Sequence, residues 1–460
     1  MVKKLNITKS NQLYKKALKI IPMGSQTYSK GVKAFSDGVS PKFLKKGKGC
    51  EVWDVDGNKF IDYVMANQPL ILGYADPDVN NAIKKQLTLG STFSVSNKLE
   101  IDVAELLNKH IPDADGARFG KNGADATSIA VRLSRAITKR QHIAFCGYHG
   151  WHDWFISTTN LNSGIPKFNN QLAHSFIYND ISSLERIFSK YKKKIACIIM
   201  EPITVNGPKS KPSGSTKWKD YNEKNNFLTD VKNLCRKNGA LLIFDEVITG
   251  FRYDIGGAQK MFNVIPDLSC WAKAMSNGVP ISAITGNWKY IKYLEKTFFS
   301  FTYGGDCIGL AAAKATINKI EKKNVIDHLY SVGKLLKDNM NELSKIYGLE
   351  ELIGCSGYPC RTVMSIRKVK KYNKPLITKT LIQQELMSRG VLWSQYQSIS
   401  FAQKKEHIYK YFKAFEDAFK VLSKIIKSGK KIENSLIGKP CLPFFTRVAD
   451  FNAAALNAKD

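Results

Sequence analysis

Two hydrophobic patterns alternate along the chain from about Leu70 to Ile320. Short apolar runs bounded by polar residues or glycine are typical of buried strands. The clearest runs are His142–Cys146, Ile195–Met200 and Ala240–Phe244. Between them lie segments such as Ala124–Thr138, in which apolar residues recur three or four positions apart, as on one face of a helix. This alternation predicts an α/β domain with a mostly parallel sheet flanked by helices.

The two ends of the chain follow a different pattern. The N-terminal stretch is polar and helix-like, and the part after about Lys323 is rich in amphipathic helix, ending in Lys404–Ile425. We therefore expect an N-terminal segment (1–69), a large domain (70–322) and a C-terminal part (323–460), with both ends combining into a smaller α+β domain. A stretch rich in Gly, Ser, Pro and Lys, Pro208–Tyr221, interrupts the rhythm and predicts an exposed loop.

Composition narrows the function classes. No apolar run reaches the roughly 18 residues of a membrane span, and the first ten residues, MVKKLNITKS, lack the apolar core of a secretory signal. The nine cysteines are scattered without metal-site spacing, which favours reduced thiols in a cytoplasmic protein and no metal. The net charge of +31 could indicate nucleic acid or an anionic membrane. Because the lysines are spread out and form no recognisable nucleic-acid-binding module, we expect neither partner.

The segment Leu241–Gly286 carries the chemistry. An apolar run delivers Asp245 at its end, and Lys273 follows in the small-residue context WAKAMSNGVP. Ligand sites of parallel sheets lie at the carboxyl ends of the strands, so both side chains can face one crevice. A pyridoxal enzyme needs such a pair: an amine for the Schiff base and a carboxylate facing the pyridine nitrogen. Taken singly, the aspartate could be a helix cap and the lysine a surface residue; the surrounding sequence favours the pair.

That surrounding sequence resembles the class III aminotransferases. FDEVITGFR followed by the lysine, GCEVWDVDGNKFIDY and SFAQKKEHI carry the resemblance over nearly the whole chain, within the branch typified by glutamate-1-semialdehyde 2,1-aminomutase. It implies fold type I of the pyridoxal-phosphate-dependent transferases, with pyridoxal 5′-phosphate as cofactor. It also implies that Lys273 holds the cofactor as a Schiff base, Asp245 pairs with its pyridine nitrogen and Val247 packs against one ring face.

The same resemblance implies further cofactor contacts. Tyr148 would stack on the other ring face, and the helix start at Asn122, Gly123 and Ala124 would hold the phosphate, although the family usually places hydroxyls there. Three more residues match family positions near the cofactor: Glu201 and Asn206 beside the ring, and Thr302 at the phosphate of a neighbouring subunit. We therefore expect a homodimer.

Two reactions fit this fold: transfer between two molecules, or an aminomutase shift within one. Where the aminomutase has an arginine for the substrate carboxylate, SQTYSKGVKAF offers only Lys30 and Lys33, and GVLWSQYQSISFAQ lacks the gating glutamate. A lysine does not reproduce the bidentate grip of an arginine. We therefore expect transfer from an amino-acid donor to an aldehyde or keto acceptor. The aminomutase reaction remains one alternative, and a catalytically silent binding homologue remains another, disfavoured because Lys273 and Asp245 are both present.

Overall fold

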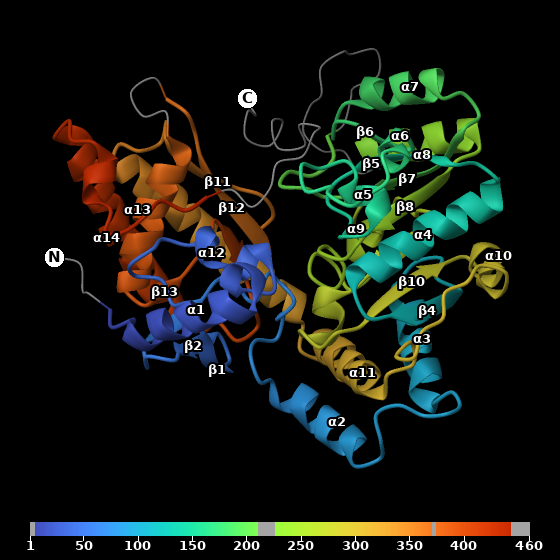
Figure 1. Cartoon of the computed structure of the whole chain (residues 1–460), viewed down its shortest axis with the longest axis horizontal. Helices are drawn as coiled ribbons and strands as arrows, with labels where there is room; N and C mark the ends of the chain where they lie inside the picture. Colours follow the sequence, from blue (N-terminus) through green and yellow to red (C-terminus); the bar gives the residue numbers. More distant parts are fainter. Residues whose placement is uncertain (1–4, 210–225, 370–373, 443–460) are drawn as a thin grey trace. The chain divides into compact units, whose positions relative to one another are not determined.

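The structure is a computed structural model that describes residues 5–209, 226–369 and 374–442. Packing divides these residues into two compact units: a smaller one from residues up to 76 and from 327 onward, and a larger one from 77 to 326 (Figure 1). The sequence pattern placed the boundaries after residues 69 and 322. Of the predicted loop Pro208–Tyr221, only Pro208 and Lys209 lie among the described residues.

The larger unit is built on a seven-stranded sheet. Its order is β4 (Gly116–Gly120), β10 (Ser282–Gly286), β9 (Leu268–Trp271), β8 (Leu241–Asp245), β7 (Ile195–Met200), β5 (His142–Cys146) and β6 (Ala173–Ser175). Only β10 runs antiparallel to its neighbours β4 and β9, so the other strands share one direction. Two predicted strands match β5 and β7, and the third lies one residue earlier than β8. The expected α/β fold with a mostly parallel sheet is confirmed.

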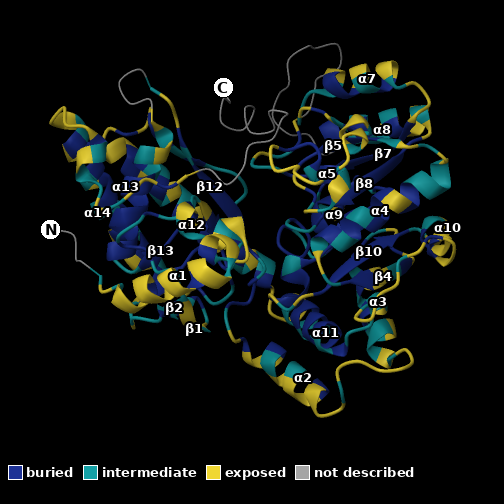
Figure 2. Cartoon of the chain, viewed as in Figure 1, coloured by how far each residue is buried: buried dark blue, intermediate teal, exposed yellow. Residues whose placement is uncertain are grey.

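Helices pack on this sheet because each presents an apolar stripe. α4 (Gly123–Thr138) buries such a stripe, including Ile129 and Leu133, against β7, β9 and β10. Figure 2 shows the sheet as a buried layer. The remaining helices of this unit are α2 (Pro77–Leu87), α3 (Lys98–His110), α5 (Asp153–Ile156), α6 (Phe168–Gln171), α7 (Ile181–Lys190), α8 (Phe227–Asn238), α9 (Gly257–Met261), α10 (Trp288–Ile291) and α11 (Cys307–Lys322).

The smaller unit joins both chain ends. Its four-stranded sheet has the order β1 (Leu44–Lys48), β2 (Glu51–Asp54), β3 (Lys59–Asp62) and β13 (Val391–Leu392), and its three-stranded sheet the order β11 (Ile353–Ser356), β12 (Arg361–Ile366) and β14 (Tyr396–Ser398). Its helices are α1 (Thr8–Ile20), α12 (Val325–Ile346), α13 (Pro375–Ser388) and α14 (Lys405–Lys427). Because β3 pairs with β13 from the far end of the sequence, the two ends form one α+β body, as expected.

Two expectations from composition can be compared with the coordinates. All nine cysteines are buried, and none forms a disulfide. Within the described ranges, no helix combines the length and apolarity that crossing a membrane requires.

One turn of the smaller unit has an unusual backbone. Four consecutive residues after β3, Met65–Gln68, have φ angles of 46°, 52°, 69° and 84°, and none is glycine. Left-handed backbone costs an L-residue about 1–2 kcal/mol. The turn is held by Asn67 N and Gln68 N, which donate to the Val64 carbonyl at 3.1 and 3.3 Å, and by Asn67 Nδ2, which donates to Ser29 Oγ at 2.8 Å. The surrounding contacts therefore impose a conformation that these side chains disfavour.

We expect Ala66→Gly to raise the free energy of unfolding by about 1 kcal/mol, because glycine adopts φ 52° without the clash of a Cβ atom. Thermal and urea unfolding of the apoprotein measure the change. The matched control is Ala82→Gly within α2, which should lower stability by about 1 kcal/mol because glycine disfavours a right-handed helix. Equal destabilisation by both substitutions would show that the turn carries no backbone strain.

Candidate active site

The register of the sheet aligns the ends of four neighbouring strands. Met200 pairs with Cys146 on one side and with Phe244 on the other, and Phe244 pairs with Ser269. The next residues form one row across the carboxyl edge: Gly147, Glu201, Asp245 and Cys270. Side chains that are far apart in the sequence are thus brought together where parallel sheets bind ligands.

Asp245 lies in this row as the last residue of β8, with only 4% of its surface exposed. Val247 N donates to its Oδ1 at 3.1 Å, and a hydrogen bond of 2.8 Å joins its Oδ2 to His149 Nδ1. Burial of a carboxylate is unfavourable unless such partners compensate it, and the two bonds also fix its orientation. The sequence did not single out His149, although its place beside Tyr148 after a strand was a usable signal.

Close backbone contacts join three loops at this edge. A Cβ atom on Gly150, whose φ is +106°, would lie 2.6 Å from Ala124 Cβ, so the loop after β5 can approach the start of α4 only with glycine. A Cβ atom on Gly123 would lie 3.0 Å from Val247 Cγ1. In addition, Thr127 Oγ1 donates to the His149 carbonyl at 2.7 Å. The candidate phosphate turn, Val247 and the loop carrying Tyr148 therefore meet.

Lys273 follows β9, the direct neighbour of β8. Asp245 pairs with Cys270, so the lysine lies three residues beyond the partner of the aspartate. It is half-buried, begins a short 3-10 helix over Lys273–Ser276 and has a φ of 46°. Trp271 Nε1 donates to Thr285 Oγ1 at 2.8 Å and anchors the preceding strand end. Left-handed backbone at a non-glycine residue often accompanies a functional role.

Of the residues predicted around the ring, Tyr148 and Glu201 are connected. Glu201 Oε1 accepts a hydrogen bond from Tyr148 N at 2.7 Å and so orients the loop. Tyr148 is 42% exposed, and its ring meets the Phe155 ring edge to face, with the ring centroids 5.5 Å apart. Asn206 is exposed, and in the part of the chain that the structure describes nothing joins it to Asp245 or Lys273.

The candidate phosphate turn opens a helix of sixteen residues. Asn122 is the N-cap of α4, and Gly123 and Ala124 are its first residues. A helix start favours an anion through its macrodipole and its unpaired N–H groups. Together with a buried carboxylate and a half-buried lysine on adjacent strands, this turn fits a group that carries a ring nitrogen, an aldehyde and a phosphate.

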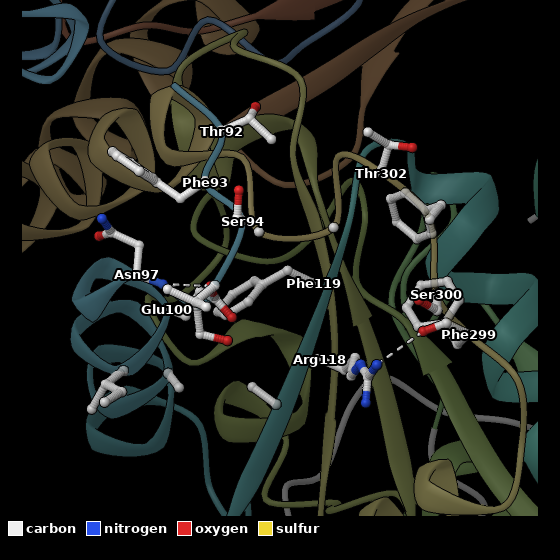
Figure 3. A pocket seen from close by; sticks show the side chains of 18 of the residues that line it. Thr92, Phe93, Ser94, Asn97, Glu100, Arg118, Phe119, Phe299, Ser300 and Thr302 are labelled. Carbon is white, nitrogen blue, oxygen red and sulfur yellow. Dashed lines mark hydrogen bonds between the residues drawn. The ribbon is translucent and has the colours of Figure 1, made fainter. Parts of the chain in front are cut away.

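Thr302 lies in the exposed segment before α11. It lines a cavity of about 750 Å³ with residues of α3, β4 and the loop before α3. Figure 3 shows Thr302 and Ser300 on one side of this cavity and Phe93 and Asn97 on the other. Arg118 Nη2 donates to the Phe299 carbonyl at 3.2 Å and holds the loop.

Glu246, next to Asp245, is fully buried and was not predicted to matter. Its carboxylate accepts hydrogen bonds from Ala258 N at 2.9 Å, from Gln259 N at 2.8 Å and from the Thr249 hydroxyl. Burial raises its pKa to about 7, with the charge of Asp245 as a minor contribution, while the hydrogen bonds act in the opposite direction. This carboxylate secures the loop after β8 and hence the base of the site.

Comparison with known proteins agrees with this geometry. The profile of the family described as Aminotransferase class-III matches residues 34–418. The chain belongs to the class III aminotransferase family. This confirms the expected enzyme class and its cofactor, pyridoxal 5′-phosphate.

Individual relatives refine the comparison. The chain is 34% identical to 3-aminobutyryl-CoA aminotransferase of Cloacimonas acidaminovorans over 80% of this chain and 86% of that protein. It is also 34% identical to glutamate-1-semialdehyde 2,1-aminomutase of Sulfurihydrogenibium sp., over 77% and 83%. Among solved structures, the pyridoxal phosphate internal aldimine form of the FumI protein of Sphingopyxis sp. MTA144 matches with a TM-score of 0.82 and 26% identity, over 94% of this chain and 100% of that one. Class III relatives thus include both transferases and aminomutases.

We expect Glu246→Gln to change how stability depends on pH. The raised pKa means that the wild-type glutamate contributes full stability below its ordinary pKa of 4.5, and that this contribution is lost as the pH rises to about 7. Glutamine does not titrate, so the variant should gain about 3 kcal/mol relative to wild type between pH 4.5 and 8. Urea unfolding across this range measures the difference. Glu342→Gln, at an exposed position, is the control, and parallel profiles for Glu246→Gln and wild type would contradict the interpretation.

Proposed function

We propose that the protein transfers an amino group from an amino-acid donor to a separate aldehyde or keto acceptor, with Lys273 as the lysine that binds the cofactor covalently. The observation that carries the proposal is the alignment of β5, β7, β8 and β9, which puts the buried Asp245 one strand away from Lys273. This is the pairing that pyridoxal chemistry needs.

Each role follows from a contact of this chain. Asp245 keeps a proton on the pyridine nitrogen, and its orientation is set by His149 and by Val247 N. Val247 and Tyr148 supply the two faces between which the ring is held, and the start of α4 binds the phosphate. When bound, pyridoxal phosphate supplies an electron-withdrawing ring that stabilises negative charge on the substrate carbon.

Lys273 acts as the base. With the cofactor and substrate bound, the Lys273 amine would take a proton from the substrate carbon and return it to another atom. Asp245 and Glu201 cannot easily replace it, because both are engaged: Asp245 with His149, and Glu201 with Tyr148 N. Together with Asp245, this lysine also argues against the catalytically silent alternative.

The residues available for an acidic substrate group support transfer between two molecules. In the smaller unit, Lys30 lines a largely apolar cavity of about 420 Å³, whereas Lys33 does not. Lys42, the other cation there, lies 3.6 Å from Asp37. A lone ammonium holds a carboxylate less firmly than an arginine fork, so a deaminated intermediate can leave. An aminomutase must retain that intermediate. Because this chain holds it weakly, the aminomutase reaction is the second candidate and transfer between two molecules is the first.

Incubation with an amino-acid donor alone should convert the lysine-bound cofactor to its amine form and release one keto acid per site, because a lysine such as Lys30 holds an acidic product less firmly than an arginine. Loss of the visible absorbance and chromatography of the keto acid measure this half-reaction.

Lys273→Ala should fold and bind cofactor without a borohydride-reducible bond. Asp245→Asn should retain that bond and lose most of the turnover, because an amide does not stabilise the pyridinium charge.

Two outcomes contradict the proposal. A reducible cofactor bond that persists in Lys273→Ala would assign the covalent role to another lysine. Conversion of glutamate-1-semialdehyde to 5-aminolevulinate at about 1 per second or faster would establish the aminomutase reaction instead.

The proposal includes a homodimer in which Thr302 reaches the partner's cofactor phosphate. Its support is the exposure of large apolar side chains near Thr302. Phe298, in the same loop, is 77% exposed, and Val95, which lines a cavity with Thr302, is 80% exposed. Burial of such side chains against a partner is favourable. A reducing, cytoplasmic setting is part of the same proposal, because nine buried free thiols persist best there.

Complementation tests the shared site. Thr302→Val should weaken cofactor binding about tenfold, as expected for the loss of a hydrogen bond to a phosphate. A heterodimer of Lys273→Ala with Thr302→Val should regain one site of wild-type affinity, because the intact lysine and the intact threonine meet across the interface. Absorbance titration of doubly tagged heterodimers measures this affinity. A surviving site as weak as in Thr302→Val, or an active monomer in sedimentation, would remove the claim.

A further inference from the structure

An ion pair joins the candidate phosphate turn to the Thr302 loop. Lys121 lies between β4 and α4, directly before Asn122, and its Nζ lies 2.7 Å from Asp306 Oδ2. The side chains are 26% and 15% exposed, so water screens this pair less than a pair on the open surface. Lys121, Asn122 and Phe301 also line one cavity of about 310 Å³. Two segments that are separated by most of the larger unit's sequence are thus in contact.

Asp306 also has a structural task. It is the N-cap of α11, and its Oδ2 accepts a hydrogen bond from Gly309 N at 2.9 Å in addition to the lysine. The loop before it is held at two carbonyls: Arg132 Nη1 donates to the Phe298 carbonyl at 2.8 Å, and Arg118 Nη2 to the Phe299 carbonyl. Lys121 therefore fixes the end of the loop nearest α11, together with the hydrogen bond from Cys307 N to the Ser91 carbonyl at 2.9 Å.

Lys121 also affects the electrostatics of the 121–124 turn. Asp125 Oδ2 accepts hydrogen bonds from Lys121 N at 2.9 Å and from Asn122 N at 2.7 Å, so a carboxylate lies beside the helix start. With Asp306 this makes two negative charges beside the turn. An arriving phosphate is repelled by both, and the Lys121 ammonium offsets part of that repulsion.

We propose that Lys121 is a positioning residue for cofactor binding. It holds the 298–306 loop against the 121–124 turn through Asp306, and it offsets the negative charge of Asp125 and Asp306 beside that turn. The inference rests on the proposed function only in taking this turn as the phosphate site. It predicts that the affinity for pyridoxal phosphate depends on the ion pair, while the chemical step at saturating cofactor does not.

The test compares four single variants, and the double variant Lys121→Met with Asp306→Asn, in apoprotein titrated with pyridoxal phosphate. Lys121→Met keeps the length without the charge, and Asp306→Asn keeps a good N-cap without the charge. Lys121→Arg preserves the pair. Lys109→Met is the matched control, because Lys109 Nζ makes a similar contact of 2.6 Å with Glu321 between α3 and α11.

We expect Lys121→Met and Asp306→Asn each to raise the dissociation constant of the cofactor about fivefold, equivalent to about 1 kcal/mol. In the double variant the two losses of binding free energy should not add, because both substitutions break the same ion pair. Lys121→Arg and Lys109→Met should stay within about twofold of wild type. The ³¹P resonance of the bound cofactor should shift in Lys121→Met and not in Lys109→Met. The kcat at saturating cofactor should change less than about threefold. Circular dichroism melts of the apoproteins confirm that each variant is folded.

Three results would overturn the inference: unchanged affinity in Lys121→Met, additive losses in the double variant, or equal losses in Lys121→Met and Lys109→Met. Failure of the proposed function has a different signature. If the enzyme is an aminomutase, it converts glutamate-1-semialdehyde while the Lys121 variants still lower the affinity for the cofactor. If the cofactor phosphate binds away from the 121–124 turn, affinity and ³¹P resonance stay unchanged in Lys121→Met, and the inference is refuted.

Discussion

The common direction of β5, β7, β8 and β9 is the constraint on which the site depends. Parallel strands end at the same edge, and their register puts Gly147, Glu201 and Asp245 side by side. No single segment could build this row, since its members come from separate strand-helix units. A slip of one residue in β8 would turn the carboxylate to the other face of the sheet, so buried strand packing indirectly protects the site.

A buried carboxylate at that edge is stable only with partners. Asp245 has His149 and Val247 N, and the neighbouring Glu246 has two backbone N–H groups and the Thr249 hydroxyl. The two acids differ because Asp245 lies at the edge where the cofactor is proposed to bind, whereas Glu246 is enclosed and its pKa rises to about 7. The proposed catalytic carboxylate thus lies at the ligand-binding edge, and a structural carboxylate is enclosed beside it.

Contacts between loops complete the arrangement. Gly150 lets the loop after β5 touch Ala124, and the Lys121–Asp306 pair ties the start of α4 to the loop carrying Thr302. Class III membership explains the overall chemistry, but these contacts belong to this chain's own side chains. Through these contacts, charge can tune the candidate phosphate turn, which lacks the hydroxyls usual in the family.

The sequence by itself determined the α/β class and the strands β5 and β7, because local hydrophobic periodicity encodes them, and a specific motif in it pointed to Asp245 and Lys273 as the candidate pair. It also indicated that both chain ends form one body. His149, the Glu246 network and the Lys121–Asp306 pair were decided only by the tertiary structure. Each is a contact between residues remote in sequence, and a lone His, Glu or Lys has no local pattern that reveals its partner. The left-handed turn at Met65–Gln68 was equally hidden, because its residues do not favour the backbone that the surrounding packing imposes on them.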